Sequence, residues 1–147
     1  MIPELGFRMS DNSRQLRRLF DERVRDLGLT AAQARLLLSL DLFPGENQCF
    51  HADRLEIEPI TLTRIADRME DAGWLERRND PADRRARILH LTGKSRDIVD
   101  KLQATVELLF EDTLKGLSAS ERDTLGRLLD RIGDNLARAR AMELADG

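Results

Sequence analysis

The sequence contains a single cysteine, Cys49, so no intramolecular disulfide can form in its 147 residues. A chain without a disulfide framework is typical of a reducing compartment. It has no run of about 18 apolar residues, the length that a transmembrane helix requires. The first ten residues have neither the basic start nor the apolar core of a secretory signal. These absences predict a cytoplasmic protein that does not interact with a membrane.

Patterns typical of enzymes are also missing. We find no glycine-rich phosphate-binding loop, no Ser/His/Asp or Cys/His set with a workable layout, and no carboxylate pair in a recognisable cleft. We therefore predict no catalytic residue and no cofactor. Cys49 and His51 are two residues apart, and in a helix they point to nearly opposite faces, so we predict no metal site.

Charge and leucine are abundant. Charged residues make up 35% of the chain and hydrophobic residues 41%, which suits one helix-rich domain with a sizeable core. The net charge of −3 argues against non-specific nucleic-acid binding, but arginines concentrate in one short stretch. That stretch contains Arg77, Arg78, Arg84, Arg85 and Arg87. Such segregation can give an acidic protein a basic face.

Apolar residues recur at steps of three and four, which predicts helices over most of the chain. The first helix is expected over 9–27. Thr30 and Gln33 form a capping box that opens the second helix, and Pro44-Gly45 ends it. A short third helix is expected over 48–55.

A fourth helix is predicted from Glu58-Pro59 to Gly73, because a proline suits the first helical position. Two strands, 74–78 and 85–91, should form a hairpin around a moderately long loop that contains a turn-forming Asp-Pro.

The C-terminal third of the chain is predicted to be helical again. Thr92 or a neighbour should cap a long fifth helix, and the capping box of Ser118 and Glu121 should open the last one. The tail after Met142 is expected to fray.

Two short helices, a tight turn and an arginine-rich hairpin follow one another as in a winged helix-turn-helix. Thr61, Arg64 and Arg68 stand at i, i+3 and i+7 of the fourth helix, opposite its apolar stripe. Threonine can contact a thymine methyl, and arginine can bind guanine or phosphate. The hairpin arginines can follow the DNA backbone or enter the minor groove. This pattern predicts binding to double-stranded DNA.

The arginine cluster and the leucine stripes each have an alternative role. The hairpin arginines can form a solvated face paired with Glu76, Asp80 and Asp83, and the leucine stripes can belong to a monomer core. The competing classes of protein are an enzyme, and a helical adaptor that binds only protein. An adaptor does not need arginines on a hairpin beside a polar helix face.

Residues 57–70, IEPITLTRIADRME, resemble the recognition helix of the MarR (multiple antibiotic resistance regulator) family. Residues 71–78 continue into its first wing strand. Residues 80–87, DPADRRAR, followed by Leu91-Thr92, are similar to its wing motif. Residues 27–33 resemble its junction between the first two helices. The resemblance covers roughly residues 27–95 in sequence, and the whole chain in the order of its helices.

The resemblance implies a homodimer that binds a pseudo-palindromic operator. It implies a single MarR-type domain over 1–147, with a DNA-binding lobe at 30–92 and dimerisation helices at 1–28 and 93–142. It also implies a ligand-responsive repressor, and a small anionic aromatic compound is the candidate effector.

The resemblance assigns roles to individual residues as well. The DNA-binding residues would be Thr61, Thr63, Arg64, Arg68, Arg84, Arg85 and Arg87. Asp83 would stabilise the wing by pairing with Arg68 or Arg85. The dimer interface would include Leu16, Phe20, Leu125, Leu129, Ile132 and Leu136.

The sequence departs from the family at three positions. The family more often has apolar residues where Glu46 and His51 stand, and another wing arginine where Ile88 stands. Cys49 offers an oxidative route of regulation as the alternative to an effector. We favour a plain structural thiol, because only His51 lies close by to lower its pKa.

Overall fold

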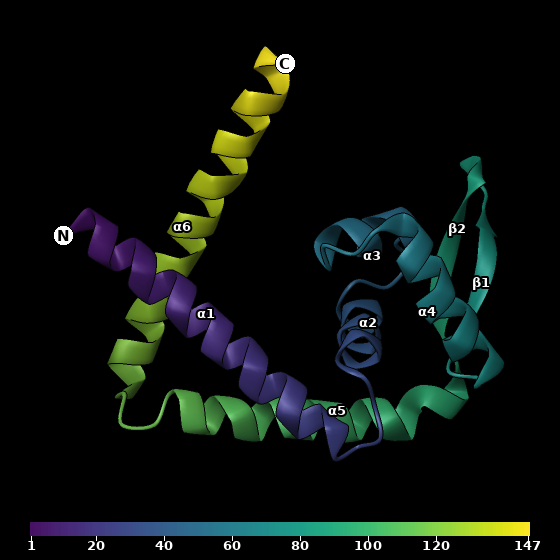
Figure 1. Ribbon diagram of the computed structural model, residues 1–147, viewed down its shortest axis with the longest axis horizontal. Coiled ribbons are helices and arrows are strands. Elements are labelled where there is room, and N and C mark those ends of the chain that lie inside the picture. The colour runs from purple at the N-terminus through teal and green to yellow at the C-terminus, as the bar shows by residue number, and fades with distance from the viewer. The chain divides into compact units, whose positions relative to one another are not determined.

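The computed structural model describes residues 1–147 and is mostly helical, with a two-stranded antiparallel sheet (Figure 1). This confirms the predicted fold class. In chain order the elements are α1 (Ile2–Arg25), α2 (Ala31–Leu42), α3 (Gln48–Arg54), α4 (Pro59–Asp71), β1 (Leu75–Asp80), β2 (Asp83–Leu91), the 3-10 turn η1 (Gly93–Ser95), α5 (Arg96–Thr113) and α6 (Ala119–Asp146). None of these helices is both long and apolar enough to cross a lipid bilayer.

The chain divides into two compact units, Met1–Leu109 and Phe110–Gly147, and the boundary lies inside α5. All members of the apolar core belong to the first unit. Its fully buried aliphatic side chains come from α1, α2, α4, both strands and α5, and they include Val24, Leu36, Leu37, Leu62, Leu75, Leu89, Val99 and Leu102. The burial of these side chains is the main force that holds the elements of this unit together.

The helix α2 begins at the predicted capping box. The Thr30 hydroxyl accepts a hydrogen bond from the Gln33 N–H at 3.1 Å, and the Gln33 side chain accepts one from the Thr30 N–H at 3.1 Å. Two of the N–H groups that an isolated helix start leaves unpaired are thereby satisfied. The helix ends at Leu42, two residues before Pro44, as predicted.

A tight turn joins α3 to α4. The Glu56 N–H donates to the Asp53 carbonyl at 3.1 Å, and the Ile57 N–H donates to the Ala52 carbonyl at 3.0 Å. This pair of bonds is a Schellman motif, which needs a left-handed residue at the position of Glu56. Glu56 has a φ of 53° and is the only non-glycine residue with a positive φ. Glycine would adopt this conformation without the steric cost that a side chain adds.

His51 is completely buried in α3 and makes a polar contact with α2. Its Nδ1 lies 2.7 Å from the hydroxyl oxygen of Ser39, which is also buried. Its other ring nitrogen, Nε2, is buried without a hydrogen-bond partner. The polar residue that stands where the resemblance expects an apolar one therefore lies in the core all the same.

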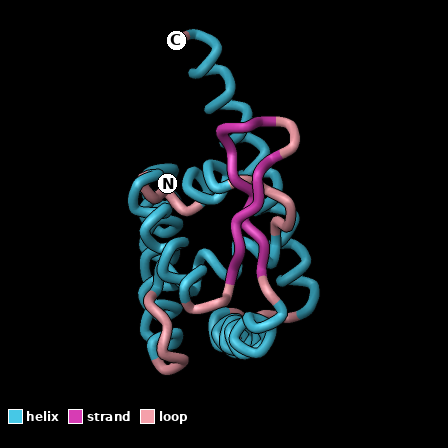
Figure 2. The backbone as a smooth tube through the Cα atoms, turned by 90° about the vertical axis from the view of Figure 1, so that its right-hand side faces the viewer, coloured by secondary structure: helices cyan, strands magenta, loops and turns pink.

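The hairpin differs from the predicted one. The strands extend to Asp80 and begin again at Asp83, so only Pro81 and Ala82 separate them (Figure 2). The predicted loop of residues 79–83 is therefore wrong. Its outer residues pair across the sheet, with Asn79 opposite Arg87 and Asp80 opposite Asp83. The Asp80 side chain accepts a hydrogen bond from the Ala82 N–H at 2.9 Å, which stabilises the short turn.

Three helix boundaries also need correction. The helix α1 begins at Ile2 rather than at residue 9, because Pro3 is accepted in the first turn of a helix. Thr92 does not cap the fifth helix with its side chain. Its hydroxyl donates to the Gly73 carbonyl, and α5 begins after η1, at Arg96. The last helix continues past Met142 to Asp146.

The second unit consists of the end of α5 and α6. The predicted capping box is present, because the Ser118 hydroxyl accepts from the Glu121 N–H at 3.1 Å and the Glu121 carboxylate accepts from the Ser118 N–H at 3.0 Å. No residue of α6 is buried, although its apolar residues recur on one side. Leu125 and Ile132 are half-buried, and Leu129 and Leu136 are exposed.

We predict that acid destabilises this fold through His51. Burial, reinforced by the positive charge of Arg54, lowers the pKa of the His51 ring below its ordinary value. In the unfolded chain the ring takes up a proton near pH ~6.5. Its contribution to stability is therefore complete above that pH, and is lost as the pH falls toward the lower pKa of the folded state. The free energy of unfolding in urea should decrease below pH ~6.5, by at most about 1.4 kcal/mol per pH unit from this residue.

The variant His51→Asn provides the comparison, because its amide can still bond to Ser39 but does not titrate. It should be less stable at neutral pH, since a smaller side chain leaves a cavity, yet its stability should change less between pH ~7 and ~5 than that of the original protein. The variant His90→Asn, at the other histidine, should keep the original pH dependence. An unchanged dependence in His51→Asn would rule out His51 as its source.

Candidate nucleic-acid interface

The helix α4 has one face for the core and one for solvent. Pro59 occupies its first turn, where the missing N–H costs nothing. Leu62, Ala66 and Met69 are fully buried. The predicted contact residues Thr61, Arg64 and Arg68 are all exposed. The spacing of these three residues in the sequence therefore predicted the correct face of the helix.

Thr63, which was also predicted to contact DNA, is half-buried and already engaged within the protein. Its hydroxyl donates to the Pro59 carbonyl at 2.9 Å and accepts a hydrogen bond from the Gln48 side-chain amide at 2.7 Å. The second bond connects α3 to the second turn of α4. Thr63 therefore fixes the angle between the two helices, whether or not it has a further partner.

The hairpin of β1 and β2 corresponds to the predicted wing, and its arginines lie where the strand register is irregular. Between Asn79 and Asp80 the partner on β2 jumps from Arg87 to Asp83, so that Arg84, Arg85 and Ala86 have no counterpart on β1. A bulge of this kind bends a strand and redirects its side chains. Arg84, Arg85 and Arg87 are exposed, and their guanidinium groups make no hydrogen bond or ion pair.

Asp83 stabilises the wing in a way that differs from the prediction. Its carboxylate accepts a hydrogen bond from the Arg85 main-chain N–H at 2.9 Å. It forms no ion pair with the guanidinium group of Arg68 or of Arg85, so the predicted pairing is wrong. The bond spans two residues, and such a local bond holds the start of β2 in place. Ile88, the residue at the missing arginine position, is half-buried and bridges to Asn47, just before α3.

Arg77 joins the wing to α4, a role that sequence analysis did not find. The side chain of Arg77 is only 15% exposed. Its guanidinium group donates to the Asp67 carboxylate at 2.5 Å and to both carboxylate oxygens of Glu70, at 3.2 and 3.3 Å. Its main-chain N–H also donates to Glu70, at 3.1 Å. The hydrogen bonds from Arg77 lower the pKa of Glu70, and the same contacts raise the pKa of Arg77.

This contact has an electrostatic consequence as well. Asp67 and Glu70 stand beside Arg64 and Arg68 on α4, and two free carboxylates there would repel phosphate groups. Arg77 compensates part of their charge. The signal in the sequence was the pair of acids three residues apart on one helix face, followed by an arginine on the next strand.

The base of the wing has a second attachment to α4. The Lys94 ammonium group donates to the Ala72 carbonyl at 2.8 Å, at the C-terminal end of the helix. A cation suits this position, because the last carbonyls of a helix carry partial negative charge. The Thr92 N–H donates to the Trp74 carbonyl at 3.1 Å. The two ends of the hairpin are thereby held together where they leave the lobe.

The residues predicted for a dimer interface fall into two groups. Phe20 belongs to the core of this chain and is 9% exposed, and Leu16 is half-buried against that core. These two have little surface to offer to another molecule. The residues of α6 do have such surface, as described above. Exposed apolar side chains of α1 that the prediction did not include are Ile2, Leu5, Phe7, Met9 and Leu19.

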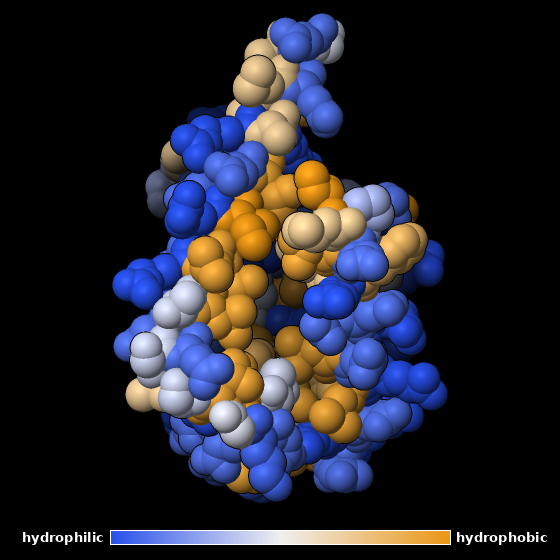
Figure 3. All heavy atoms as spheres, turned by 90° about the vertical axis from the view of Figure 1, so that its left-hand side faces the viewer, coloured by the Kyte–Doolittle hydropathy of each residue, from blue (hydrophilic) through white to orange (hydrophobic).

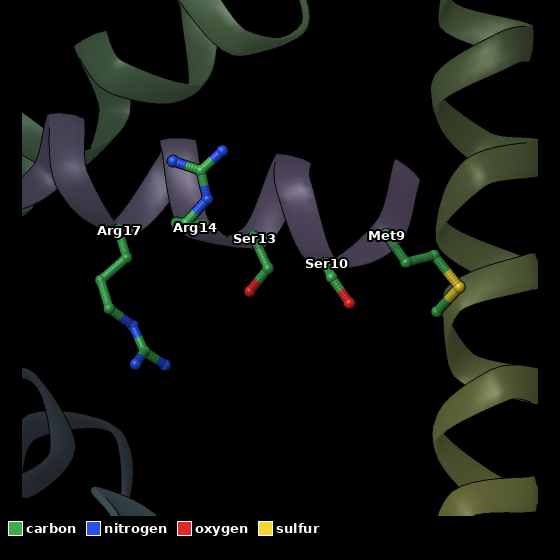
Figure 4. A pocket seen from close by; sticks show the side chains of 5 residues that line it. All are labelled: Met9, Ser10, Ser13, Arg14 and Arg17. Carbon is green, nitrogen blue, oxygen red and sulfur yellow. The ribbon is translucent and has the colours of Figure 1, made fainter. Parts of the chain in front are cut away.

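An open hollow of about 440 Å³ lies against α1 and is lined by Met9, Ser10, Ser13, Arg14 and Arg17. Figure 4 shows Ser10, Ser13 and Arg17 pointing to the same side of the helix. Cys49 is exposed on α3, whereas His51 is buried, so the two side chains lie in different environments.

We predict that Arg77→Met loosens the wing. The change removes the hydrogen bonds of the guanidinium group to two carboxylates, so that Asp67 loses its partner and Glu70 keeps only the main-chain N–H of residue 77. Since these acids are partly exposed, the expected loss of unfolding free energy is only about 1–2 kcal/mol. Arg78→Met is the matched control, because Arg78 pairs only with Glu76 in an exposed position. Urea unfolding, together with amide exchange of the hairpin, distinguishes the two. Equal effects of both substitutions would contradict the role given to Arg77.

Comparison with known proteins agrees with this geometry. The family model described as "MarR family" matches residues 29–86. The transcriptional regulator PA3341 is 30% identical and has a TM-score of 0.81, with 91% of this chain and 98% of the other covered. MarR from E. coli without ligand is 29% identical, with a TM-score of 0.74 and coverage of 87% and 95%.

A cysteine-to-serine variant of E. coli MarR, solved in complex with operator DNA, is 30% identical and has a TM-score of 0.71. The alignment covers 89% of this chain and 94% of that one. Similarity at this level extends over nearly the whole length of both proteins, and therefore over the terminal helices as well as the lobe that the family model matches. The chain belongs to the MarR family of transcriptional regulators.

Proposed function

We propose that this protein is a sequence-specific DNA-binding transcription regulator that binds a pseudo-palindromic operator as a homodimer. The observation that carries the proposal is a set of five exposed arginines without partners on two neighbouring elements. These are Arg64 and Arg68 on α4, and Arg84, Arg85 and Arg87 on the wing. Two acids of α4, Asp67 and Glu70, are engaged by Arg77.

The dimensions of the two elements suit a DNA duplex. The 13 residues of α4 form a helix roughly 20 Å long, and an α-helix fits into the major groove. Thr61 and Arg64, near its N-terminal end, are the candidates for contact with base edges. The wing is a thin ribbon whose bulge carries Arg84 and Arg85, which suits phosphate contact or the minor groove. The operator complex of the E. coli relative also supports DNA as the ligand.

Substitutions of Arg64 and Arg85 test this assignment. If Arg64 contacts a base, Arg64→Ala should weaken binding to a sequence selected from random DNA by roughly 1–3 kcal/mol and relax the preference at one position. Arg85→Ala should weaken binding to all sequences alike and reduce the slope of log K against log salt by about one. Arg127→Ala on α6 is the control and should change neither. If the original protein binds no DNA in this selection, the proposal fails in favour of a protein-binding adaptor.

Unburied apolar surface supports the dimer. Leu128, Leu129 and Leu136 of α6 are 47%, 54% and 63% exposed, and α6 has no buried residue. Ile2 and Phe7 of α1 are 82% and 72% exposed. Apolar side chains reach the surface among hydrophilic ones on the face that Figure 3 displays. Apolar surface of this extent is costly in water unless a partner covers it, and a second copy of the chain is the partner that we propose.

We predict that Leu129→Asp converts the protein to a monomer or an unfolded chain, because it places a charge in the proposed interface. Sedimentation at micromolar concentration measures the change. Leu42→Asp is the control, since Leu42 is 65% exposed at the end of α2, outside the proposed dimerisation helices. A monomeric original protein that still binds its operator would contradict the dimer.

Repression and release by a small anionic aromatic effector belong to the same proposal. Its support is the family resemblance, together with Arg17 at the hollow on α1, where a cation would attract an anion. An effector acts only if it prefers the geometry that does not bind DNA. Salicylate should therefore release the operator without unfolding the protein. If peroxide releases it instead, and Cys49→Ser abolishes that release, the oxidative route replaces the effector.

A further inference from the structure

The helix α2 has a polar connection to each of the two helices that flank the DNA-binding lobe in sequence. In its first half, the Arg35 guanidinium group donates to the Asp21 carboxylate of α1 at 2.5 Å. Near its C-terminal end, the Gln103 amide of α5 donates to the Asp41 carboxylate at 2.5 Å. The four residues lie within the first compact unit.

Both connections are partly shielded from water. The side chains of Arg35 and Asp21 are 29% and 26% exposed, whereas the pairs Arg14–Asp11, Arg18–Glu22 and Arg96–Asp100 join side chains that are each more than half exposed. Asp41 and Gln103 are half-buried as well, although they are 62 residues apart in the chain. A polar contact shielded in this way is stronger and more restrictive in geometry than an exposed one.

The two contacts can restrict movements of α2 that apolar packing alone would allow. Apolar contacts between helices are not directional, so a helix can slide or rotate by small amounts at little cost. Hydrogen bonds depend on distance and angle. Arg35 and Asp41 are six residues apart, which separates them by roughly 9 Å along α2 and places them on different sides of it. Two directional contacts at different heights and on different sides restrict both sliding and rotation.

The position of α2 matters because the other parts of the lobe pack on it. It contacts α3, α4 and β2, and His51 of α3 bonds to its Ser39. A rotation of α2 relative to α1 and α5 would therefore carry α4 and the wing with it. In a dimer, the distance between the two copies of α4 must match about one turn of DNA, 34–36 Å.

We propose that Arg35, Asp21, Gln103 and Asp41 are positioning residues. Their two contacts set the distance between the two copies of α4 in the dimer, and thereby the spacing of the DNA half-sites that the dimer accepts. The inference rests on the proposed homodimer and its proposed DNA binding. None of the four residues contacts DNA in this proposal. They act by holding the lobe in one orientation on the helices that join the two subunits.

The single cysteine makes this testable in the otherwise unmodified protein. Cys49 is exposed on α3, so a nitroxide spin label there reports one distance between the two lobes of a dimer. Double electron–electron resonance on the labelled dimer should give a single narrow distribution of the distance between the two labels. Arg35→Met and Gln103→Leu should each broaden that distribution, and the double variant should broaden it most. Sedimentation should show that all of these variants remain dimeric.

Two comparisons separate this role from a general loss of stability. Arg96→Met removes an exposed ion pair with Asp100 on α5 and should leave the distribution narrow. The exchange Asp21→Arg with Arg35→Asp should restore a narrow distribution, whereas each of its single changes broadens it. If Arg35→Met does not fold cooperatively in urea, Asp21→Asn, which preserves shape, takes its place.

The second measurement is how much affinity the protein loses when the spacing between the two DNA half-sites is changed. On the sequence selected from random DNA, one base pair inserted between the half-sites should reduce the affinity of the original protein more than that of the double variant. Unchanged distance distributions and an unchanged penalty for the insertion would overturn the inference while leaving the proposed function intact. An original protein that gives no dipolar signal and sediments as a monomer would instead refute the proposed dimer, and the inference with it.

Discussion

The burial of α2 is the interaction on which the rest of the first unit depends. Leu36 and Leu37 are fully buried, and Leu40 is 3% exposed. The helix contacts α1, α3, α4 and β2, so that it is the common neighbour of the elements that carry the candidate interface. Its apolar surface supplies most of the energy of this packing, and its polar side chains determine the orientation. Because α4 and β2 pack on α2, the positions of the arginines on α4 and on the wing depend on the position of α2.

The charge of the candidate interface depends on which arginines are paired with carboxylates. An acidic protein with a net charge of −3 presents unpaired arginines on α4 and on the wing, while Asp67 and Glu70 of α4 are engaged by Arg77. Arg77 and Arg64 carry the same guanidinium group, yet their environments differ. The first is largely buried between two carboxylates, and the second is exposed without a partner. The amino-acid composition therefore says little about the charge of this surface, which depends on which arginines are paired with carboxylates.

Local patterns predicted the helices and most of the candidate site, and contacts between distant residues account for what they missed. Capping boxes at Thr30 and Ser118 and the proline at the start of α4 act over a few residues, so the sequence displays them directly. The strand register depends on pairing across the hairpin, which made the predicted loop too long. The contacts of Arg77 with α4 and of His51 with Ser39 span seven to twelve residues and require the fold itself.

The short turn of the wing has a mechanical consequence. A hairpin whose first strand has six residues extends roughly 20 Å from its base at the usual rise per residue. An isolated two-stranded ribbon has little rigidity of its own. The inner half of the wing is held by Arg77 and Lys94, which bond to α4, and by the bridge between Ile88 and Asn47. Beyond these contacts the two strands are held only by their bonds to each other, so a small tilt of the inner half would move the arginines near the tip sideways by a larger distance.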